Sequence, residues 1–123
     1  MMRILRRHHI SFKNAFAGVW WALKTQPNFR VHLVISALAF ALGVYLRITH
    51  IEMAIILFTI LLGLTVEMLN TSIESMTDLI TTEWKTSAKI AKDVSAGMML
   101  LVAIGAVGIA AFIYIPYLLP FMQ

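Results

Sequence analysis

The chain contains no cysteine, only three prolines, and few charged residues, which make up 13% of its 123 residues. Without cysteine, disulfide bonds and thiolate metal sites are excluded. A short soluble domain leaves a large part of its surface in contact with water, and so few charges cannot cover such a surface. The composition therefore argues against a water-soluble protein.

Apolar residues dominate what is present. They form 60% of the chain, whose mean hydropathy is +0.84. A helix needs about 20 apolar residues to cross the hydrocarbon core of a bilayer. The positions of the charged residues delimit three apolar segments, at residues 31–46, 53–66 and 94–119. The third is long enough, the first is long enough with its flanks, and helical periodicity extends the second to about residue 80.

The sequence therefore predicts an all-α integral membrane protein that forms one domain over residues 1–123. We expect its transmembrane helices at residues 29–48, 52–80 and 91–119. Pro27 precedes the first of them, and Pro116 and Pro120 are expected to close the third, because proline suits helix ends and disrupts helix interiors.

Basic residues are distributed unevenly around these helices. Nine of the ten flank the N-terminal segment or the second connection, and only Arg47 lies in the other loop. Because lysine and arginine favour the cytoplasmic side of a membrane, we expect a cytoplasmic N-terminus and an external C-terminus. The net charge of +4 is then explained by a basic collar facing anionic lipid, and no nucleic-acid partner is expected.

An amphipathic helix is predicted before the first span, at about residues 10–26. Phe12, Phe16 and Trp20 lie on one face of it, whereas Lys13 and Lys24 lie off that face. This pattern is typical of a helix in the membrane interface, with its aromatic face among the lipid headgroups. The alternative is a helix that packs on the bundle without contacting lipid.

An unusual set of polar residues follows the second apolar segment. At about 100° per residue, Glu67, Glu74 and Asp78 share a narrow face of one helix, and Asn70 lies beside them. Acids near membrane depth are costly and usually face a protein interior or a compensating cation. The expected compensators are a divalent metal, which prefers carboxylate oxygens, and the lysines of the next connection. This combination suits phosphate chemistry.

Each of these residues also has a structural interpretation. Glu74 and Asp78 can be the solvated end of a helix that leaves the membrane. Glu67 fits that interpretation poorly, because it follows an apolar run and no cation is near it in the sequence. Further along, Lys92-Asp93 can hold a phosphate and its metal. Glu83-Trp84-Lys85 is also typical of an interfacial tryptophan anchor.

A non-enzymatic oligomeric protein, such as a holin-like protein or a small channel subunit, is the competing functional class. In that class the acidic face lines a pore or a proton path. Lys92-Asp93, together with Glu83 and Lys85, distinguishes the two classes, because a nucleotide site needs these residues and a proton path does not.

The same residues resemble the small bacterial membrane-embedded family of diacylglycerol kinases and undecaprenol kinases. The resemblance rests on Glu67-x-x-Asn70-Thr71-x-x-Glu74-x-x-x-Asp78 and on the later segment Ala88-Lys89-Ile90-Ala91-Lys92-Asp93. Asn28-Phe29-Arg30 and Ser11-Phe12-Lys13 also match, so that the resemblance covers nearly the whole chain.

The resemblance implies a homotrimer in the bacterial inner membrane, with active sites shared between neighbouring subunits. It implies transfer of the γ-phosphate of ATP to the primary hydroxyl of a membrane lipid, with Mg²⁺ as the cofactor. The residues of these motifs are more similar to those of the undecaprenol kinase branch, which implies undecaprenol as the lipid acceptor. The alternative is phosphorylation of diacylglycerol to phosphatidic acid.

The resemblance also assigns roles to matching positions. Glu67 matches the catalytic base, and Glu74 matches the ligand of the metal that bridges the nucleotide phosphates. The positions that match ATP contacts are Arg7, Asn14, Glu74, Glu83, Trp84, Lys85, Lys92 and Asp93. The positions that match supporting residues are Asn70, Asp78 and Arg30.

One position departs from the family pattern. Many members carry a glutamate four residues before the arginine of the Asn-Phe-Arg motif, as a second metal ligand, and this chain has Gln26 there. An amide oxygen can coordinate Mg²⁺ but binds it more weakly than a carboxylate does. We therefore expect Gln26 to be a weaker metal ligand. The sequence has no Walker-type glycine loop, so positioned carboxylates, lysines and metal must supply the chemistry.

Overall fold

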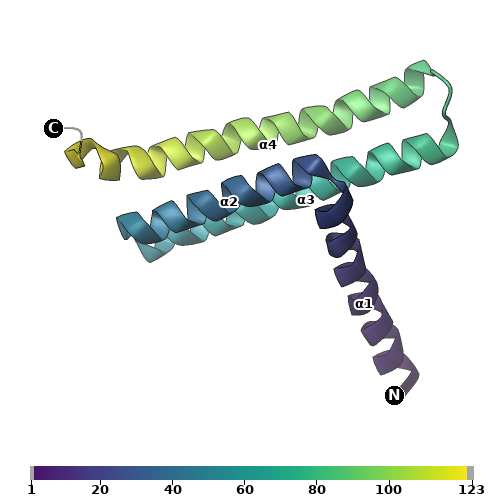
Figure 1. Ribbon diagram of the computed structural model, residues 1–123, viewed down its shortest axis with the longest axis horizontal. Coiled ribbons are helices and arrows are strands. Elements are labelled where there is room, and N and C mark those ends of the chain that lie inside the picture. The colour runs from purple at the N-terminus through teal and green to yellow at the C-terminus, as the bar shows by residue number, and fades with distance from the viewer. Residues whose placement is uncertain (1, 122–123) are drawn as a thin grey trace.

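Four long helices form the fold in the computed structural model, which describes residues 2–121 and the side chains of residues 10–120. The elements are α1 (Met2–Thr25), α2 (Pro27–Leu46), α3 (His50–Ile80), α4 (Thr86–Leu118) and a 3₁₀ turn at Leu119–Phe121. Helices α2, α3 and α4 run alongside one another, and α1 projects steeply away from them (Figure 1). Because α2, α3 and α4 are each long and apolar enough to cross a membrane, the predicted all-helical fold with three spans is confirmed.

Some helix ends differ from the predicted ones. The first helix begins at Met2 and not near residue 10, and the last begins at Thr86 and not near residue 91. Hydropathy located the apolar part of each helix and missed the polar turns that precede it. The end of the third span lies one residue from the predicted one, because α4 ends at Leu118 with Pro116 in its last turn. A proline this close to a helix end removes a single backbone hydrogen bond, and the 3₁₀ turn that contains Pro120 then follows.

The turn between α2 and α3 is held by backbone and side-chain contacts. Arg47 adopts a left-handed conformation with φ of 53° at the end of α2. Thr49 and Glu52 form a capping box: the Glu52 N–H donates to Thr49 Oγ1 over 3.3 Å, and the Thr49 N–H donates to Glu52 Oε2 over 2.8 Å. The box satisfies amide groups that the start of a helix leaves free. Tyr117 also donates to Glu52 Oε2, over 2.7 Å, so the same carboxylate fastens the end of α4.

A small apolar core lies beside this turn, and we call this region the closed end. It consists of Gly43, Ile48, Ile56, Ile113 and Tyr114. Gly43 permits the close approach of its neighbours, because an added Cβ would lie 3.0 Å from both Ile48 Cδ1 and Met53 Cε. The buried Tyr114 hydroxyl donates to the carbonyl oxygen of Ala39 over 2.7 Å, which satisfies it without water.

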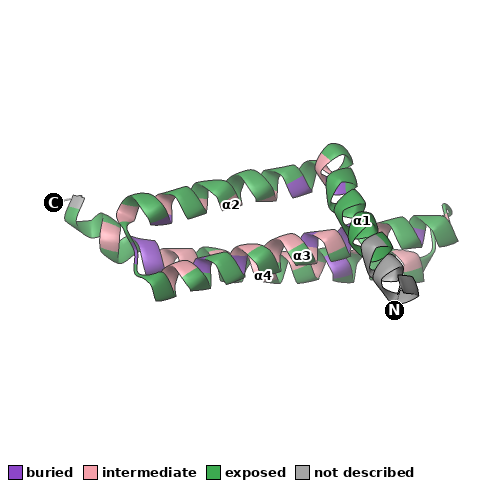
Figure 2. Cartoon of the chain, turned by 90° about the horizontal axis from the view of Figure 1, so that it is seen from below, coloured by how far each residue is buried: buried purple, intermediate pink, exposed green. Residues whose placement is uncertain are grey.

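Most apolar side chains are exposed in a single copy of the chain. Its accessible surface is 9709 Å², whereas a compact soluble protein of this mass exposes about 6,600 Å². Figure 2 shows buried residues only as small patches on the helices, with exposed residues over the rest. An apolar surface of this extent requires lipid or further protein against it.

Helix α3 is longer than a membrane is thick. Its 31 residues extend about 46 Å, and the hydrocarbon core of a bilayer is about 30 Å thick. One end of α3 must therefore leave the hydrocarbon. Its C-terminal half carries Glu67, Glu74 and Asp78 and leads to the lysines that follow, so this half reaches the polar interface.

Candidate active site

The C-terminal half of α3 carries the polar face predicted from the sequence, which we call the polar stripe: Glu67, Asn70, Glu74 and Asp78. Residues three or four apart are neighbours on a helix surface, and this spacing aligns the four side chains. Glu67 is 3% exposed and Asn70 is 7% exposed, whereas Glu74 is half-buried and Asp78 is exposed. The stripe therefore leads from a buried acid to a solvated one along a single face.

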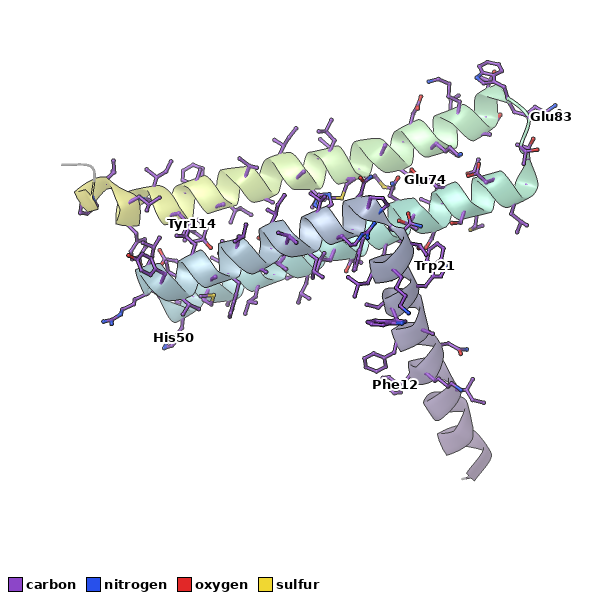
Figure 3. All side chains as sticks on the ribbon, in the orientation of Figure 1. Phe12, Trp21, His50, Glu74, Glu83 and Tyr114 are labelled. Carbon is purple, nitrogen blue, oxygen red and sulfur yellow. The ribbon has the colours of Figure 1, made fainter. Side chains whose placement is uncertain are left out.

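Hydrogen bonds connect the middle of the stripe to α4. Asn70 Nδ2 donates to Glu74 Oε1 over 3.2 Å, within α3. The hydroxyl of Ser95 in α4 donates to Asn70 Oδ1 over 2.6 Å. The orientation of the Glu74 carboxylate is thus connected, through one amide, to the neighbouring helix. Figure 3 places Glu74 and Glu83 toward the end of the bundle opposite to His50 and Tyr114.

Three ion pairs surround the solvated end of the stripe. They are Lys92 with Asp78, Lys89 with Asp93, and Lys85 with Glu83. The first joins α4 to α3, with Lys92 Nζ 2.5 Å from Asp78 Oδ1. All six side chains are between 39% and 77% exposed, so that water and salt screen these pairs. The lysines therefore remain accessible to a phosphate group that competes with the carboxylates.

A pocket of about 380 Å³ opens between the ends of α3 and α4 beside these ion pairs. Its lining includes Glu83, Trp84, Lys85, Lys92 and Asp93, which are the five predicted ATP contacts of the loop and of α4. All three ion pairs also line it, so three acids balance three lysines. The Trp84 side chain is exposed and offers an aromatic face on which a nucleobase can stack.

An apolar pocket of about 160 Å³ lies among α2, α3 and α4, on the membrane side of the stripe. Gly63 and Leu64 contribute to its lining. Glu67 follows these two residues by about one helical turn, which places it on the same face of α3. The buried acid thus lies where the apolar interior of the bundle meets the polar stripe.

The remaining predicted site residues lie on the first two helices. Asn14 is exposed on α1, and Arg30 is exposed near the start of α2. Gln26 precedes α2, and its Nε2 donates to Thr25 Oγ1 over 3.3 Å. None of these three residues lines the 380 Å³ pocket of the same copy. The prediction for Arg7 falls on a side chain outside the described residues.

Ser95 and Thr77 belong to this site and were not predicted from the sequence. Thr77 is buried and lines the pocket, and Ser95 is fully buried against Asn70. A signal for Ser95 was present: it is the only polar side chain between Asp93 and Tyr114. For Thr77 there was no signal, because a threonine in a helix often bonds only to its own backbone, as this one does to Ile73.

The acids fit Mg²⁺ only in combination with a nucleotide. Among the residues whose side chains are described, no three acids or histidines gather as a metal site. Proteins commonly hold Mg²⁺ with one or two carboxylates together with substrate phosphates. Glu74 suits that role, because among the residues whose side chains are described only Asn70 bonds to its carboxylate, through Oε1.

The chain is similar to known proteins over most of its length. A family model described as prokaryotic diacylglycerol kinase matches residues 13–114. Over 114 residues the chain is 39% identical to a diacylglycerol kinase of Synechocystis sp., a match that covers 92% of the chain but 65% of that relative. It is 34% identical over 114 residues to an undecaprenol kinase of Bacillus subtilis, with 93% of each chain covered. The family match includes every predicted site residue except Arg7.

Proposed function

The chain belongs to the prokaryotic diacylglycerol kinase family, and we propose that it transfers the γ-phosphate of ATP to the primary hydroxyl of a membrane lipid. The observation that carries this proposal is the polar stripe of α3, which leads from the buried Glu67 to a lysine-lined pocket. Membership of a lipid kinase family also favours this activity over a pore or a holin-like function.

The reaction needs a lipid and a water-soluble nucleotide at one place. In our proposal the lipid hydroxyl approaches Glu67 from the membrane side, and ATP occupies the 380 Å³ pocket between the ends of α3 and α4. The stripe spans the interval between these two positions. Holding both reactants in place is the main contribution a protein makes to phosphoryl transfer.

The side chains of the chain then have distinct roles. Glu67 accepts the proton of the lipid hydroxyl while the hydroxyl oxygen forms a bond to the γ-phosphorus of ATP. The bond between that phosphorus and the β–γ bridging oxygen breaks, and ADP is released. Lys92 neutralises negative charge on the phosphates. Glu74, with Gln26 as a weaker second ligand, would hold Mg²⁺. When bound, the ion neutralises the β- and γ-phosphates.

Undecaprenol is the acceptor we propose, and diacylglycerol is the alternative. The undecaprenol kinase of Bacillus subtilis matches over nearly the full length of both chains, which supports this choice. The diacylglycerol kinase of Synechocystis sp. is more similar in sequence, but the chain spans only 65% of it. Both acceptors present a primary alcohol at a membrane surface, and the choice between them is therefore experimental.

We also propose a homotrimer in the bacterial inner membrane, with the N-terminus in the cytoplasm, the C-terminus outside, and active sites shared between subunits. The basic residues of the N-terminus and of the second connection support the orientation. The large exposed apolar surface supports an assembly. Asn14, Gln26 and Arg30 lie away from the pocket of their own copy, and a neighbouring copy can supply them.

The first experiment is phosphate transfer from labelled ATP by purified protein in mixed micelles, with undecaprenol and diacylglycerol offered separately. We expect transfer to undecaprenol, and the Glu67→Gln variant provides the background. Transfer mainly to diacylglycerol would refute undecaprenol as the acceptor and identify diacylglycerol in its place. No transfer to either, at the level of the variant, would refute the proposed activity.

Shared sites can be tested by mixing two inactive variants. Glu67→Gln changes the buried acid of the stripe on α3, and Arg30→Ala changes a residue of α2 that does not line the pocket of its own copy. If each site takes these residues from different subunits, mixed oligomers contain some sites with both residues intact, and part of the activity returns. If both residues come from the same subunit, mixing restores nothing, and the sharing then involves other residues or does not occur.

A further inference from the structure

The hydroxyl of Ser95 in α4 is more deeply buried than the side chains around it. Ser95 is 0% exposed, in a bundle whose helices are otherwise largely exposed. It lies between α4 and α3, opposite the middle of the polar stripe, and it is one turn away from Lys92. A buried hydroxyl destabilises a protein unless it is hydrogen-bonded. Its hydrogen bonds therefore indicate what it does.

The proton of Ser95 has two acceptors within reach. Ser95 Oγ lies 2.6 Å from Asn70 Oδ1 and 2.9 Å from the carbonyl oxygen of Lys92. Neither oxygen can donate, and a hydroxyl has a single proton. The shorter contact takes this proton, so Ser95 donates to Asn70 across the helix interface.

This donation determines which way the Asn70 amide faces. With Oδ1 accepting from Ser95, Nδ2 is directed at Glu74 and donates to Oε1 over 3.2 Å. In the reversed orientation, Oδ1 of Asn70 would face Oε1 of Glu74, so that two acceptor oxygens would lie against each other. The two contacts therefore agree on one orientation: Nδ2 of Asn70 faces Glu74, and Ser95 holds Oδ1 on the side of α4.

We infer that Ser95 is a positioning residue of the site: its buried hydroxyl fixes the Asn70 amide and, through it, the Glu74 carboxylate. Among the described residues, Ser95 donates toward Asn70 and Lys92 but not toward Glu74, and it does not line the 380 Å³ pocket. The kinetic consequence rests on the proposed function, in which Glu74 holds the metal of the nucleotide. The structural consequence, a fixed amide, does not rest on it.

Ser95→Ala removes the proton and leaves Asn70 Oδ1 without its donor. Losing one hydrogen bond of this kind changes an equilibrium by about fivefold to tenfold. We expect the KM for Mg-ATP to rise by that factor and the KM for the lipid to stay the same. If Ser95 only helped the helices to pack, the variant would lower kcat through a smaller active fraction and leave both KM values unchanged.

Ser72→Ala is the matched control. Ser72 is exposed on α3, and its hydroxyl donates to the carbonyl oxygen of Met68 in its own helix. The control makes the same chemical change outside the network. We expect its KM for Mg-ATP to equal that of the wild type.

A second measurement follows the amide itself and needs no turnover. The chain has three asparagines, and Asn14 and Asn28 are exposed. In an NMR spectrum of protein with isotopically labelled asparagine, the side-chain signals of Asn70 are identified by their loss in Asn70→Ala. We expect them to lie apart from the two exposed amides, and to shift toward them in Ser95→Ala but not in Ser72→Ala.

The two measurements separate the inference from the proposed function. Unchanged Asn70 signals in Ser95→Ala overturn the inference whatever the kinetics, and so does an unchanged KM for Mg-ATP in an active enzyme. A wild-type chain that transfers no phosphate refutes the proposed function alone, because the Asn70 signals still decide the role of Ser95.

Discussion

The two ends of the bundle are built from different interactions. At the closed end, Ile48, Ile56 and Ile113 pack together, and the polar groups of Thr49 and Glu52 satisfy one another in a capping box. At the opposite end, a buried hydrogen bond from Ser95 to Asn70 joins α4 to α3, the ion pairs are exposed, and a pocket of about 380 Å³ lies between the ends of the two helices. Figure 3 shows the two ends far apart along the bundle.

We infer that the closed end contributes most of the stability of the bundle and that the opposite end provides the groups for chemistry. Apolar packing and satisfied caps hold helices together without leaving groups free for a ligand. Exposed ion pairs add little stability but keep lysines and carboxylates ready to change partners. The closed end therefore fixes the helices, which permits the site end to remain open and charged. Three pairs of variants test this division, each with a change at one end and a comparison at the other end or at a neutral position, and a fourth test changes the proposed metal ligand.

The largest contrast is expected between two acids of α3. Glu67→Gln should lower phosphate transfer by about 10²- to 10⁴-fold while ATP still binds, because the general base is lost. Glu52→Gln should keep transfer and lower the melting temperature, since Glu52 accepts from Thr49 and Tyr117 at the closed end. Transfer rates and thermal melting in detergent check both outcomes. Equal losses of transfer in the two variants would contradict the division.

A smaller effect is expected at the metal ligand. Glu74→Gln should raise the Mg²⁺ concentration needed for half-maximal transfer by roughly tenfold or more. The rate should recover at high Mg²⁺, because the Asn70 amide and Lys92 remain in place. A magnesium titration of the transfer rate provides the measurement. A loss that magnesium does not restore would assign Glu74 a role other than metal binding.

At the closed end, filling the space beside Gly43 should destabilise the bundle. Gly43→Ala places a Cβ 3.0 Å from Ile48 Cδ1 and Met53 Cε, and these side chains must shift. We expect the free energy of unfolding to fall by about 1 kcal/mol and the KM for ATP to stay constant. Gly105→Ala is the control, because its added Cβ meets nothing within 4 Å in the same copy. Equal stability of the two variants would refute the packing argument.

The smallest effect is expected from one hydroxyl. Tyr117→Phe removes the donor that lies 2.7 Å from Glu52 Oε2, and it should cost about 1 kcal/mol or less of stability. Tyr45→Phe removes a hydroxyl from a tyrosine that is 77% exposed and should change nothing. The melting temperatures of the two variants make the comparison. A drop in transfer without a drop in stability would instead connect the closed end to the chemistry.

Much of the fold followed from hydropathy alone. Apolar segments of membrane-spanning length predicted three spans, because backbone groups in lipid must be satisfied within a helix. The ends of the helices followed less well. The polar first turn of α4, from Thr86, lies outside the apolar segment, and hydropathy therefore does not report it.

The site was predicted in part. Helical spacing placed Glu67, Glu74 and Asp78 on one face, since this needs only the period of a helix. The lining of the pocket by Glu83, Trp84 and Lys85 with Lys92 followed from the family resemblance. The sequence predicted that lysines after the stripe compensate its acids, but it did not say that Lys92 pairs with Asp78 or that Ser95 faces Asn70. Both contacts are between helices, and they depend on the rotation of α4 against α3.

The sequence by itself determined that the protein lies in a membrane, how many spans it has, and which residues form the polar stripe on α3. It also determined the family resemblance that assigns roles to the site residues. These properties depend on composition and on the period of a single helix. Only the tertiary structure decided which partner each polar group takes: Ser95 with Asn70, Lys92 with Asp78, and Tyr117 with Glu52. A partner across a helix interface is set by how two helices are placed and rotated against each other, and no one-dimensional pattern contains that information.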